Sequence, residues 1–303
     1  MQIARRDKIY YYHSKDNEPA IMVDPGELFA VDTELCSGAW LKDITDVWSK
    51  EKSRGPNPTV CIGVRNSFPG DLLCIDILDI DPEGLGYTAI LDARLNHAIM
   101  GRDMEPCPRT VAISEGKINW SSRLKIPVKP MIGTLGTSSP EGRLNSWGGC
   151  YGGNMDVSEI TTGTRVYLPV SYEGALVNVG DVHAIQGDGE ICNAGGIECR
   201  ARVKLKASIV KNGISQKCVR AEDEKYLMTI ACLLSTDESF YLACSELIRF
   251  VCSRYLITEE ECFQLASQVM EARCTQYVNP TRSYICKIPK NILDAGYEQV
   301  NEH

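Results

Sequence analysis

The sequence predicts a mainly β protein whose helices lie in the C-terminal third. Short runs of alternating apolar and polar residues, separated by Pro-Gly and other turns, recur through the first 210 residues. After residue 236 the apolar residues instead recur at helical spacing. We therefore expect a β-rich body over residues 1–236 that carries the functional site, and a helical region over residues 237–303 packed on it. The two parts could also form one continuous domain.

Two Pro-Gly turns mark the first strands. Proline presets φ and the following glycine accepts the left-handed conformation, so 24–26 and 68–71 each predict a tight turn. The apolar runs beside these turns predict strands over residues 20–23, 28–31 and 72–80. Residues 121–150 are rich in Gly, Ser and Pro, and we expect a long irregular segment there, of a kind that is usually functional or disordered.

Two helices are expected near the C-terminus. Residues 237–255 place apolar side chains at helical spacing. Thr258 and the three glutamates after it supply an N-cap and an acidic first turn for a second helix that continues through Ala272. Asn279-Pro280 then breaks the helical pattern, and residues 284–288 predict a closing strand. Earlier in the chain, residues 87–100 are expected to be strand or loop.

The composition excludes several classes of protein. A net charge of −8 and a pI near 5.2 argue against a nucleic-acid or anionic-membrane binder, because neither polyanion is attracted to an acidic surface. No apolar run approaches the ~20 residues that span a bilayer. The N-terminus lacks the apolar core of a signal peptide. The 14 cysteines contain no Cys-x-x-Cys pair, so we expect reduced thiols and a cytoplasmic location.

The stretch Gly180-Asp-Val-His-Ala-Ile-Gln-Gly-Asp-Gly-Glu190 is the strongest candidate for chemistry. It lies between runs that read as strands, at 165–170 and 176–179 before it and at 199–206 after it. Its glycines allow a tight turn, so an imidazole and several polar groups can converge on one point. Such a group can bind a divalent metal or act as an acid–base pair. The alternative is a polar hairpin tip with a satisfied histidine.

Three stretches together resemble the acetamidase/formamidase family of metal-dependent amide hydrolases. They are Gly152-Gly-Asn-Met-Asp156; Tyr167-Leu-Pro-Val170 with Gly174-Ala175 and 180–190; and Thr258–Ser267 with Gln276-Tyr-Val-Asn-Pro280. The resemblance implies a β-sandwich-like fold with peripheral helices and assembly into homodimers or larger oligomers. It also implies hydrolysis of a small linear amide, such as formamide or acetamide, to a carboxylate and ammonia. The expected cofactor is a divalent metal, zinc, with a second ion such as calcium as a further option.

The resemblance also suggests roles for individual residues. Zinc activates water and polarises a carbonyl, so the site needs ligands and a base. We expect His183 to be a ligand, with a carboxylate supplied by Asp32. Glu190 is the candidate general base and later acid, assisted by Asp188. Substrate orientation or hydrogen bonding to a ligand is expected from Asn154, Asp156 and Gln186. His97 is a spare ligand candidate that we expect to be structural or exposed.

The chain departs from the family pattern at positions that matter for activity. Where the family has an acid, Thr and a further acid, this chain has Asp32-Thr-Glu-Leu35, so Leu35 replaces the later acid. Many members place a histidine before the Gly-Gly-Asn motif, where this chain has Tyr151. These departures motivate an alternative function, in which a catalytically altered member binds a small molecule or metal as an interaction subunit.

Two nucleophile-based amidase mechanisms are rivals to metal catalysis. Gly136-Thr-Ser-Ser139 superficially offers the serines of a Ser-Ser-Lys amidase. Cys150, beside Gly148-Gly149, could be a thiol nucleophile, because backbone amides there could lower its pKa. Neither has an identifiable partner at fixed spacing, and we expect both to be turn residues first.

Overall fold

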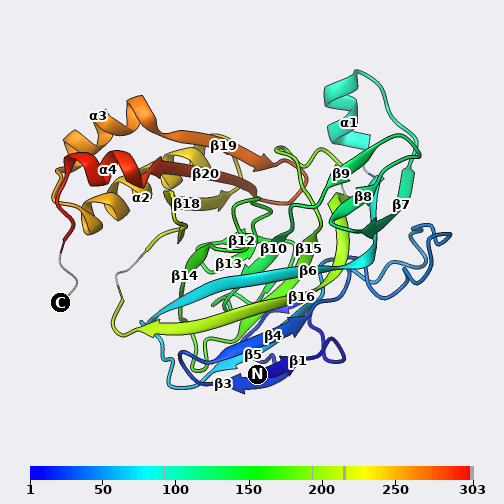
Figure 1. Cartoon of the computed structure of the whole chain (residues 1–303), viewed down its shortest axis with the longest axis horizontal. Coiled ribbons are helices and arrows are strands. Elements are labelled where there is room, and N and C mark those ends of the chain that lie inside the picture. The colour runs from blue at the N-terminus through cyan, green and yellow to red at the C-terminus, as the bar shows by residue number, and fades with distance from the viewer. Residues whose placement is uncertain (92, 193, 214–215, 301–303) are drawn as a thin grey trace.

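The computed structural model describes residues 1–91, 93–192, 194–213 and 216–300, and within these ranges the chain forms a mainly β protein. Strands account for 42% of the chain and helices for 15%, which confirms the predicted fold class. Most strands belong to one curled 18-stranded sheet, and β2 (Tyr12–His13) pairs separately with β11 (Arg143–Leu144). Figure 1 shows the helices α2, α3 and α4 together at one end of the molecule.

Two long strands form the spine of the sheet. β6 (Leu72–Ile90) and β16 (Ala194–Val210) pair antiparallel along almost their whole length and cross the centre of Figure 1 side by side. The predicted strand 72–80 is therefore the first half of a longer one. Its second half contains Pro82, which is tolerated because the register shifts between residues 199 and 201 of β16, opposite that point.

The remaining strands extend this spine on both sides. They are β1 (Gln2–Ala4), β3 (Ile21–Val23), β4 (Leu28–Asp32), β5 (Thr59–Val64), β7 (Cys107–Ser114), β8 (Lys117–Asn119), β9 (Lys125–Pro127), β10 (Met131–Gly136), β12 (Gly148–Gly149), β13 (Gly152–Asn154), β14 (Arg165–Pro169), β15 (Val177–His183), β17 (Val219–Glu222), β18 (Tyr226–Leu233), β19 (Glu271–Gln276) and β20 (Arg282–Pro289). β9, β10, β11 and β12 lie inside the stretch expected to be irregular, so that expectation is wrong for their residues, most clearly for 131–136. Every residue of β10 is buried, and a strand buried on both faces lacks the alternation that identifies strands.

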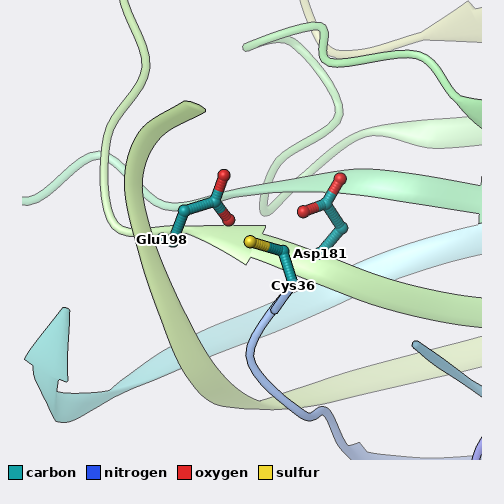
Figure 2. Close-up of side chains that lie close together, drawn as sticks. All are labelled: Cys36, Asp181 and Glu198. Carbon is teal, nitrogen blue, oxygen red and sulfur yellow. The ribbon is translucent and has the colours of Figure 1, made fainter. Parts of the chain in front are cut away.

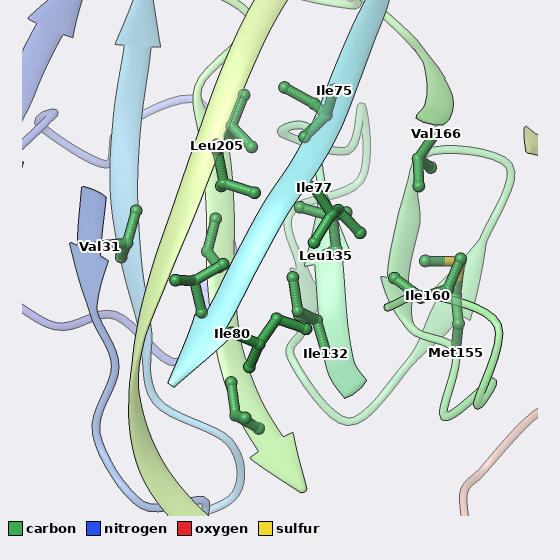
Figure 3. Packing of buried hydrophobic residues seen from close by; sticks show 14 of the residues in the cluster. Val31, Ile75, Ile77, Ile80, Ile132, Leu135, Met155, Ile160, Val166 and Leu205 are labelled. Carbon is green, nitrogen blue, oxygen red and sulfur yellow. The ribbon is translucent and has the colours of Figure 1, made fainter. Parts of the chain in front are cut away.

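The main hydrophobic core collects side chains from strands far apart in the sequence. Figure 3 shows aliphatic side chains from β4, β6, β10, β14 and β16 meeting side chains of the segment 155–160. The labelled members are Val31, Ile75, Ile77, Ile80, Ile132, Leu135, Met155, Ile160, Val166 and Leu205. Each fully buried side chain of this size stabilises the fold by about 1.5–3 kcal/mol. This core fixes the strands that carry the candidate site.

The C-terminal helices begin where the sequence predicts them. α2 (Thr236–Arg254) has Ser235 as its N-cap residue. The next helix, α3 (Glu259–Val269), has Thr258 as its N-cap residue, and the Thr258 hydroxyl accepts a hydrogen bond from the Glu261 amide. The expectation that this second helix reaches Ala272 is wrong. Residues 271–276 form β19, because their backbone pairs with β20. A short helix, α4 (Lys290–Gly296), follows the predicted closing strand.

One further helix was not expected. α1 (Ala93–Met100) follows β6 in the stretch assigned to strand or loop. The sheet also crosses the predicted boundary at residue 236, because β18 precedes it and pairs with β20 beyond it. The division into two domains stays a prediction. None of the helices in the described ranges is long and apolar enough to cross a membrane.

Candidate metal centre

His183 ends β15 and lies in the interior of the protein. β15 pairs antiparallel with β16, and the register places His183 directly opposite Glu198. The His183 Nε2 atom lies 3.1 Å from Glu198 Oε1 and 3.6 Å from Asp181 Oδ1. Neither contact has hydrogen-bond geometry, and Nε2 has no hydrogen-bond partner among the described residues. The imidazole is 0% exposed, so water does not reach it from the surface.

Gln186 fixes the tautomer of this imidazole. The Gln186 Nε2 group donates to the Asp156 carbonyl at 2.8 Å, which leaves its Oε1 as the acceptor that lies 2.7 Å from His183 Nδ1. His183 therefore carries a proton on Nδ1, and in its neutral form the lone pair of Nε2 points toward the carboxylates. An imidazole held in this way is prepared to bind a cation through Nε2.

Two further acids meet His183 from separate loops. Asp156, His183 and Glu190 each offer a ligand atom within 4.8 Å of the others. Asp156 Oδ2 accepts a hydrogen bond from Asn279, whereas Asp156 Oδ1 and Glu190 Oε2 are buried without a partner in the part of the chain that the structure describes. Both acids have a left-handed backbone, with φ of 49° and 43°. Such strain in residues other than glycine is concentrated at functional sites.

A second group of donors adjoins the first. Cys36, Asp181 and Glu198 point toward one another from the loop after β4, from β15 and from β16 (Figure 2), again with ligand atoms within 4.8 Å. Asp181 Oδ2 accepts a hydrogen bond from Asn57 Nδ2 at 2.9 Å, and Thr134 Oγ1 lies 3.2 Å from the same oxygen. Asp181 is therefore held with its other oxygen toward His183.

Burial and mutual repulsion disturb the ionisation of this cluster. Burial, together with the charge of Asp181, raises the pKa of Asp156 to about 7. Burial, together with Asp156, raises the pKa of Glu190 well above its usual range, and burial also raises that of Glu198. Burial lowers the pKa of His183, but Glu198 and Asp181 outweigh it and hold that pKa well above its usual value. Buried acids at this density need a positive partner.

The absence of a side chain at two glycines, Gly133 and Gly195, makes room for the side chains of the cluster. A Cβ on Gly133 would lie 2.4 Å from Asp156 Oδ1 and 2.8 Å from Asp181 Oδ2. A Cβ on Gly195 would lie 2.1 Å from a Glu198 oxygen and 3.0 Å from His183 Nε2. Carbon and oxygen atoms do not approach so closely, so glycine is required at both positions for the side chains to converge.

The residues present fit a divalent cation. Buried Nε2 and carboxylate oxygens without partners are unusual in native proteins, and together they form a donor set that suits zinc. The thiol of Cys36 makes the second group better suited to zinc than to calcium, which takes oxygen ligands.

The structure brings together some of the residues expected at the site. His183, Glu190, Asp156 and Gln186 lie in one cluster. Asn154 lies one contact away, because its Oδ1 accepts a hydrogen bond from Thr134, the neighbour of Asp181.

Two of the expected residues lie elsewhere. Asp188 is 58% exposed at its side chain and pairs with Arg273 at 2.7 Å. Asp32 forms a two-point ion pair with Arg202 across β4 and β16 and also pairs with Arg5, and these arginines lower its pKa. Asp181 and Glu198 occupy the positions beside His183 where a carboxylate from Asp32 was expected.

Sequence reasoning did not select Asp181, Glu198 or Cys36 as site residues. A signal exists for Asp181, which precedes His183 by two residues and so shares its face of the strand. Glu198 could be found only from the register that pairs 183 with 198. Cys36 comes from a distant loop, and no local pattern indicates it.

The positions that depart from the family pattern are buried in packing contacts. Leu35 is 1% exposed and packs with Trp40 and Tyr87 in a small apolar cluster that includes Cys36. Tyr151 is buried against His13, with ring centroids 5.1 Å apart, and its hydroxyl donates to the Trp147 carbonyl. Both side chains are structural in these contacts.

The candidate nucleophiles are engaged in other contacts. The Ser138 and Ser139 hydroxyls donate to the carbonyls of Ser14 and His13. Desolvation raises the pKa of the Cys150 thiol, which is the opposite of activation. His97 is exposed and pairs with Asp103, as expected for a surface histidine. These contacts favour the cluster around His183 as the chemical centre.

A cavity of about 610 Å³ lies beside this centre. Gln186, which bonds His183, is part of its wall, together with Asp188 and Arg273. The cavity therefore ends one side chain away from the imidazole.

This fold and site define a mainly β protein with a buried histidine–carboxylate centre suited to a divalent cation. Residues 148–295 match the Acetamidase/Formamidase family. The chain is similar to that family over this part of its length. It superposes on a predicted acetamidase/formamidase of the thermophile Thermoanaerobacter tengcongensis with a TM-score of 0.88 and 29% identity, covering 97% of each chain. An acetamidase of Bacillus halodurans gives a TM-score of 0.87 and 26% identity over 97% of this chain and 99% of that one.

The match to curated relatives is partial. The formamidase of Methylophilus methylotrophus is 24% identical over 256 residues, which are 64% of this chain. The chain spans less than two thirds of that relative, 62% of its length. The acetamidase of Mycolicibacterium smegmatis is 26% identical over 281 residues, covering 69% of this chain and 68% of that enzyme.

Proposed function

We propose that this protein hydrolyses the carbon–nitrogen bond of a small linear amide and releases ammonia. The observation that carries the proposal is the buried group of His183, Asp156 and Glu190, in which a nitrogen and two carboxylate oxygens lack partners among the described residues. The similarity to acetamidases and formamidases suggests the class of reaction.

Two adjacent donor sets would hold metal. In the first, His183 and Asp156 would be the ligands and Glu190 would lie beside the ion as the base; Cys36, Asp181 and Glu198 form the second. A divalent ion in these sets, which we expect to be zinc, would act as a Lewis acid, lower the pKa of water to roughly 7 and favour the ionised form of the acids around it.

Glu190, next to Asp156, is proposed to transfer the proton from the attacking water to the leaving nitrogen. Burial and their mutual repulsion raise the pKa of both carboxyls, and a cation in the site would favour the ionised form of Glu190, which can accept a proton. In the proposal Glu190 accepts the proton of the attacking water and passes it to the leaving nitrogen, while Asn279 holds Asp156 in place. Gln186 keeps the His183 ring oriented throughout.

The burial of the centre supports a small substrate. His183 and its acids lie beneath the surface, and the adjoining cavity is limited by Gln186. Formamide and acetamide carry at most one carbon beyond the carbonyl, and their polar groups need a partner, which the Asn154 side chain would offer nearby. We also expect the protein to form homodimers or larger assemblies.

A panel of simple amides tests this proposal. Purified protein is loaded with zinc, its metal content is measured by plasma mass spectrometry, and ammonia release is followed with formamide, acetamide, propionamide and benzamide. We expect release from the first two and much less from benzamide. A zinc-loaded protein that releases no ammonia from any of the four amides would contradict the amidase proposal.

One observation favours a second candidate function. Leu35 places an apolar, fully buried side chain next to Cys36, where the family pattern has an acid. If that acid is needed for turnover, the chain binds metal or a small molecule without hydrolysing it. Metal binding without ammonia release in the same assay identifies this case.

A further inference from the structure

Tyr87 lies in the same row of the sheet as His183. The register of β15 and β16 places His183 opposite Glu198, and the register of β16 and β6 places Glu198 opposite Tyr87. Side chains directly opposite each other on neighbouring strands point to the same face of a sheet. The three residues therefore form one row, and all are buried, at 0%, 3% and 1% exposure. Tyr87 extends the histidine–carboxylate centre by one strand.

The Tyr87 hydroxyl contacts the second group of donors through Cys36. Its oxygen lies 3.1 Å from Cys36 Sγ, in a contact where either atom can donate. Figure 2 shows the same thiol pointing toward Asp181 and Glu198. The Cys36 sulfur therefore has both carboxylates and a hydroxyl as neighbours.

The hydrogen bonding continues from Tyr87 to an indole. The Tyr87 hydroxyl lies 2.7 Å from Ser37 Oγ, and Trp40 Nε1 donates to the same Ser37 Oγ at 2.8 Å. Cys36, Ser37, Trp40 and Tyr87 are all buried. The Trp40 and Tyr87 rings also pack edge to face, with their centroids 5.0 Å apart. Packing and hydrogen bonds together hold this chain of side chains in place.

The two ends of the chain fix its direction when Cys36 is ionised. An indole N–H can only donate, so Ser37 accepts from Trp40 and keeps its own proton for Tyr87. A thiolate can only accept, so Tyr87 donates to Cys36. Ser37 and Tyr87 are both hydroxyls, and the bond between them can run in the direction that this requires. Each donor then points toward the sulfur.

A thiolate at this position needs such a donor. The thiolate is the form of cysteine that binds a metal ion. Burial and the neighbouring carboxylates of Asp181 and Glu198 oppose a further negative charge on Cys36. A hydrogen bond to a charged acceptor offsets part of this cost, and a chain of hydrogen bonds strengthens the last one.

We propose that Tyr87 is a positioning residue for a thiolate-bound metal ion. Its hydroxyl, supported by Ser37 and Trp40, orients and stabilises the Cys36 thiolate in the second donor set. A thiolate held in this way favours an ion that accepts sulfur ligands, such as zinc, over magnesium or calcium. The inference rests on the proposed function, in which this donor set holds a metal ion. It gives Tyr87 a role beyond packing.

Cobalt(II) in place of zinc tests the proposal without any measurement of turnover. A thiolate bound to cobalt(II) gives a sulfur-to-metal charge-transfer band in the near ultraviolet, and a hydrogen bond to the sulfur moves the band to higher energy. We expect the parent protein to show this band and Cys36→Ser to lose it. Tyr87→Phe keeps the ring without the hydroxyl, so its band should lie at longer wavelength. Cobalt titrated at this band should bind Tyr87→Phe about 10–100-fold more weakly.

Two further variants separate the hydrogen bond from packing. Tyr151→Phe removes another buried tyrosine hydroxyl, which donates to the Trp147 carbonyl, and should leave the band and the cobalt affinity unchanged. Ser37→Ala removes the donor behind Tyr87, so its band should shift in the same direction by a smaller amount. Ser37→Ala alone decides the outcome if Tyr87→Phe does not fold. An unshifted band with unchanged affinity in the deciding variant, or an equal shift in Tyr151→Phe, overturns the proposal.

The same cobalt-loaded samples distinguish this inference from the amidase proposal. If the parent protein binds cobalt and releases ammonia from an amide without the charge-transfer band, Cys36 is not a ligand. This inference then fails, and the amidase proposal stands. If the band appears and shifts as expected but no amide is hydrolysed, the amidase proposal fails and the role of Tyr87 stands.

Discussion

His183 and Glu198 face each other across two antiparallel strands, with Nε2 and Oε1 3.1 Å apart and not hydrogen-bonded. An imidazole nitrogen and a carboxylate oxygen at this distance normally share a proton. In the neutral imidazole the proton is on the opposite nitrogen, held by Gln186. In that form the two atoms present lone pairs to the same space, which is the arrangement that a cation requires.

Replacing His183 should remove the metal. We expect His183→Gln to bind zinc at least about 100-fold more weakly than the parent, since even residues that only orient a ligand are worth roughly 10–100-fold. Competition with a chelator, followed by plasma mass spectrometry, measures this. His97→Gln is the matched control, because His97 is exposed and pairs with Asp103 at the surface. Full zinc occupancy in His183→Gln would exclude His183 as a ligand.

Replacing Glu190 should separate binding from turnover. Glu190→Gln keeps the shape of the side chain and should retain zinc, yet lower kcat by roughly 10²–10⁴-fold, the usual contribution of an acid–base group. Metal content and ammonia release are measured on the same sample. If the zinc is lost as well, Glu190 is a ligand, and Asp156 becomes the candidate base.

Asp188 provides the comparison for Glu190. It lies two residues away but is exposed and bound to Arg273. An exposed ion pair contributes about 0–1 kcal/mol, so Asp188→Asn should change kcat less than about fivefold. A loss as large as that of Glu190→Gln would return Asp188 to the catalytic group.

The sequence contained enough information for the fold class but not for every strand. Pro-Gly turns and alternating runs identified the strands near 20–31 and 72–80, because each has one wet face or a clear turn. The strand at residues 131–136 was not predicted, because a strand buried on both faces has an apolar, glycine-rich sequence without alternation. The helix α1 was not predicted, because a single helix of eight residues has only a weak periodic pattern.

The same limit applies to the site. The turn that ends at Glu190 was found because glycines and polar groups occur together within it. Glu198 and Cys36 were not found, since only the pairing of β15 with β16 and the position of the loop after β4 bring them to His183. Asp32 lies on β4 of the same sheet, but Arg202 lies opposite it on β16 and donates hydrogen bonds to both of its carboxylate oxygens.

The cluster should be sensitive to a single added methyl group. Gly133→Ala would place its Cβ 2.4 Å from Asp156 Oδ1, and backbone at β10 leaves little room to move. We expect loss of zinc affinity and of ammonia release together, measured as for His183. Gly187→Ala is the matched control, because a Cβ there meets no atom within 4 Å although it lies in the same turn as Gln186. Equal effects in the two variants would mean that the space at Gly133 is not needed.

The decrease in the free energy of unfolding between pH 6.5 and pH 4 should depend on His13. Burial lowers the pKa of His13 to about 4, and its bond to the Thr137 carbonyl only partly offsets this effect. The folded protein therefore excludes a proton that the unfolded chain, with a pKa near 6.5, accepts. The contribution is complete above pH 6.5 and is lost as the pH falls toward 4. At about 1.4 kcal/mol for each pH unit of that window, the loss approaches about 3 kcal/mol.

His13→Gln should remove this pH dependence, because glutamine stays neutral. The variant can be less stable than the parent at pH 7, since His13 packs against Tyr151. We expect the difference in free energy of unfolding between parent and variant to shift by about 3 kcal/mol in the variant's favour between pH 7 and pH 4, measured by urea titration of metal-free protein. Exposed His97→Gln should show no such shift. A difference that stays constant with pH would mean that the proton enters the folded protein without cost.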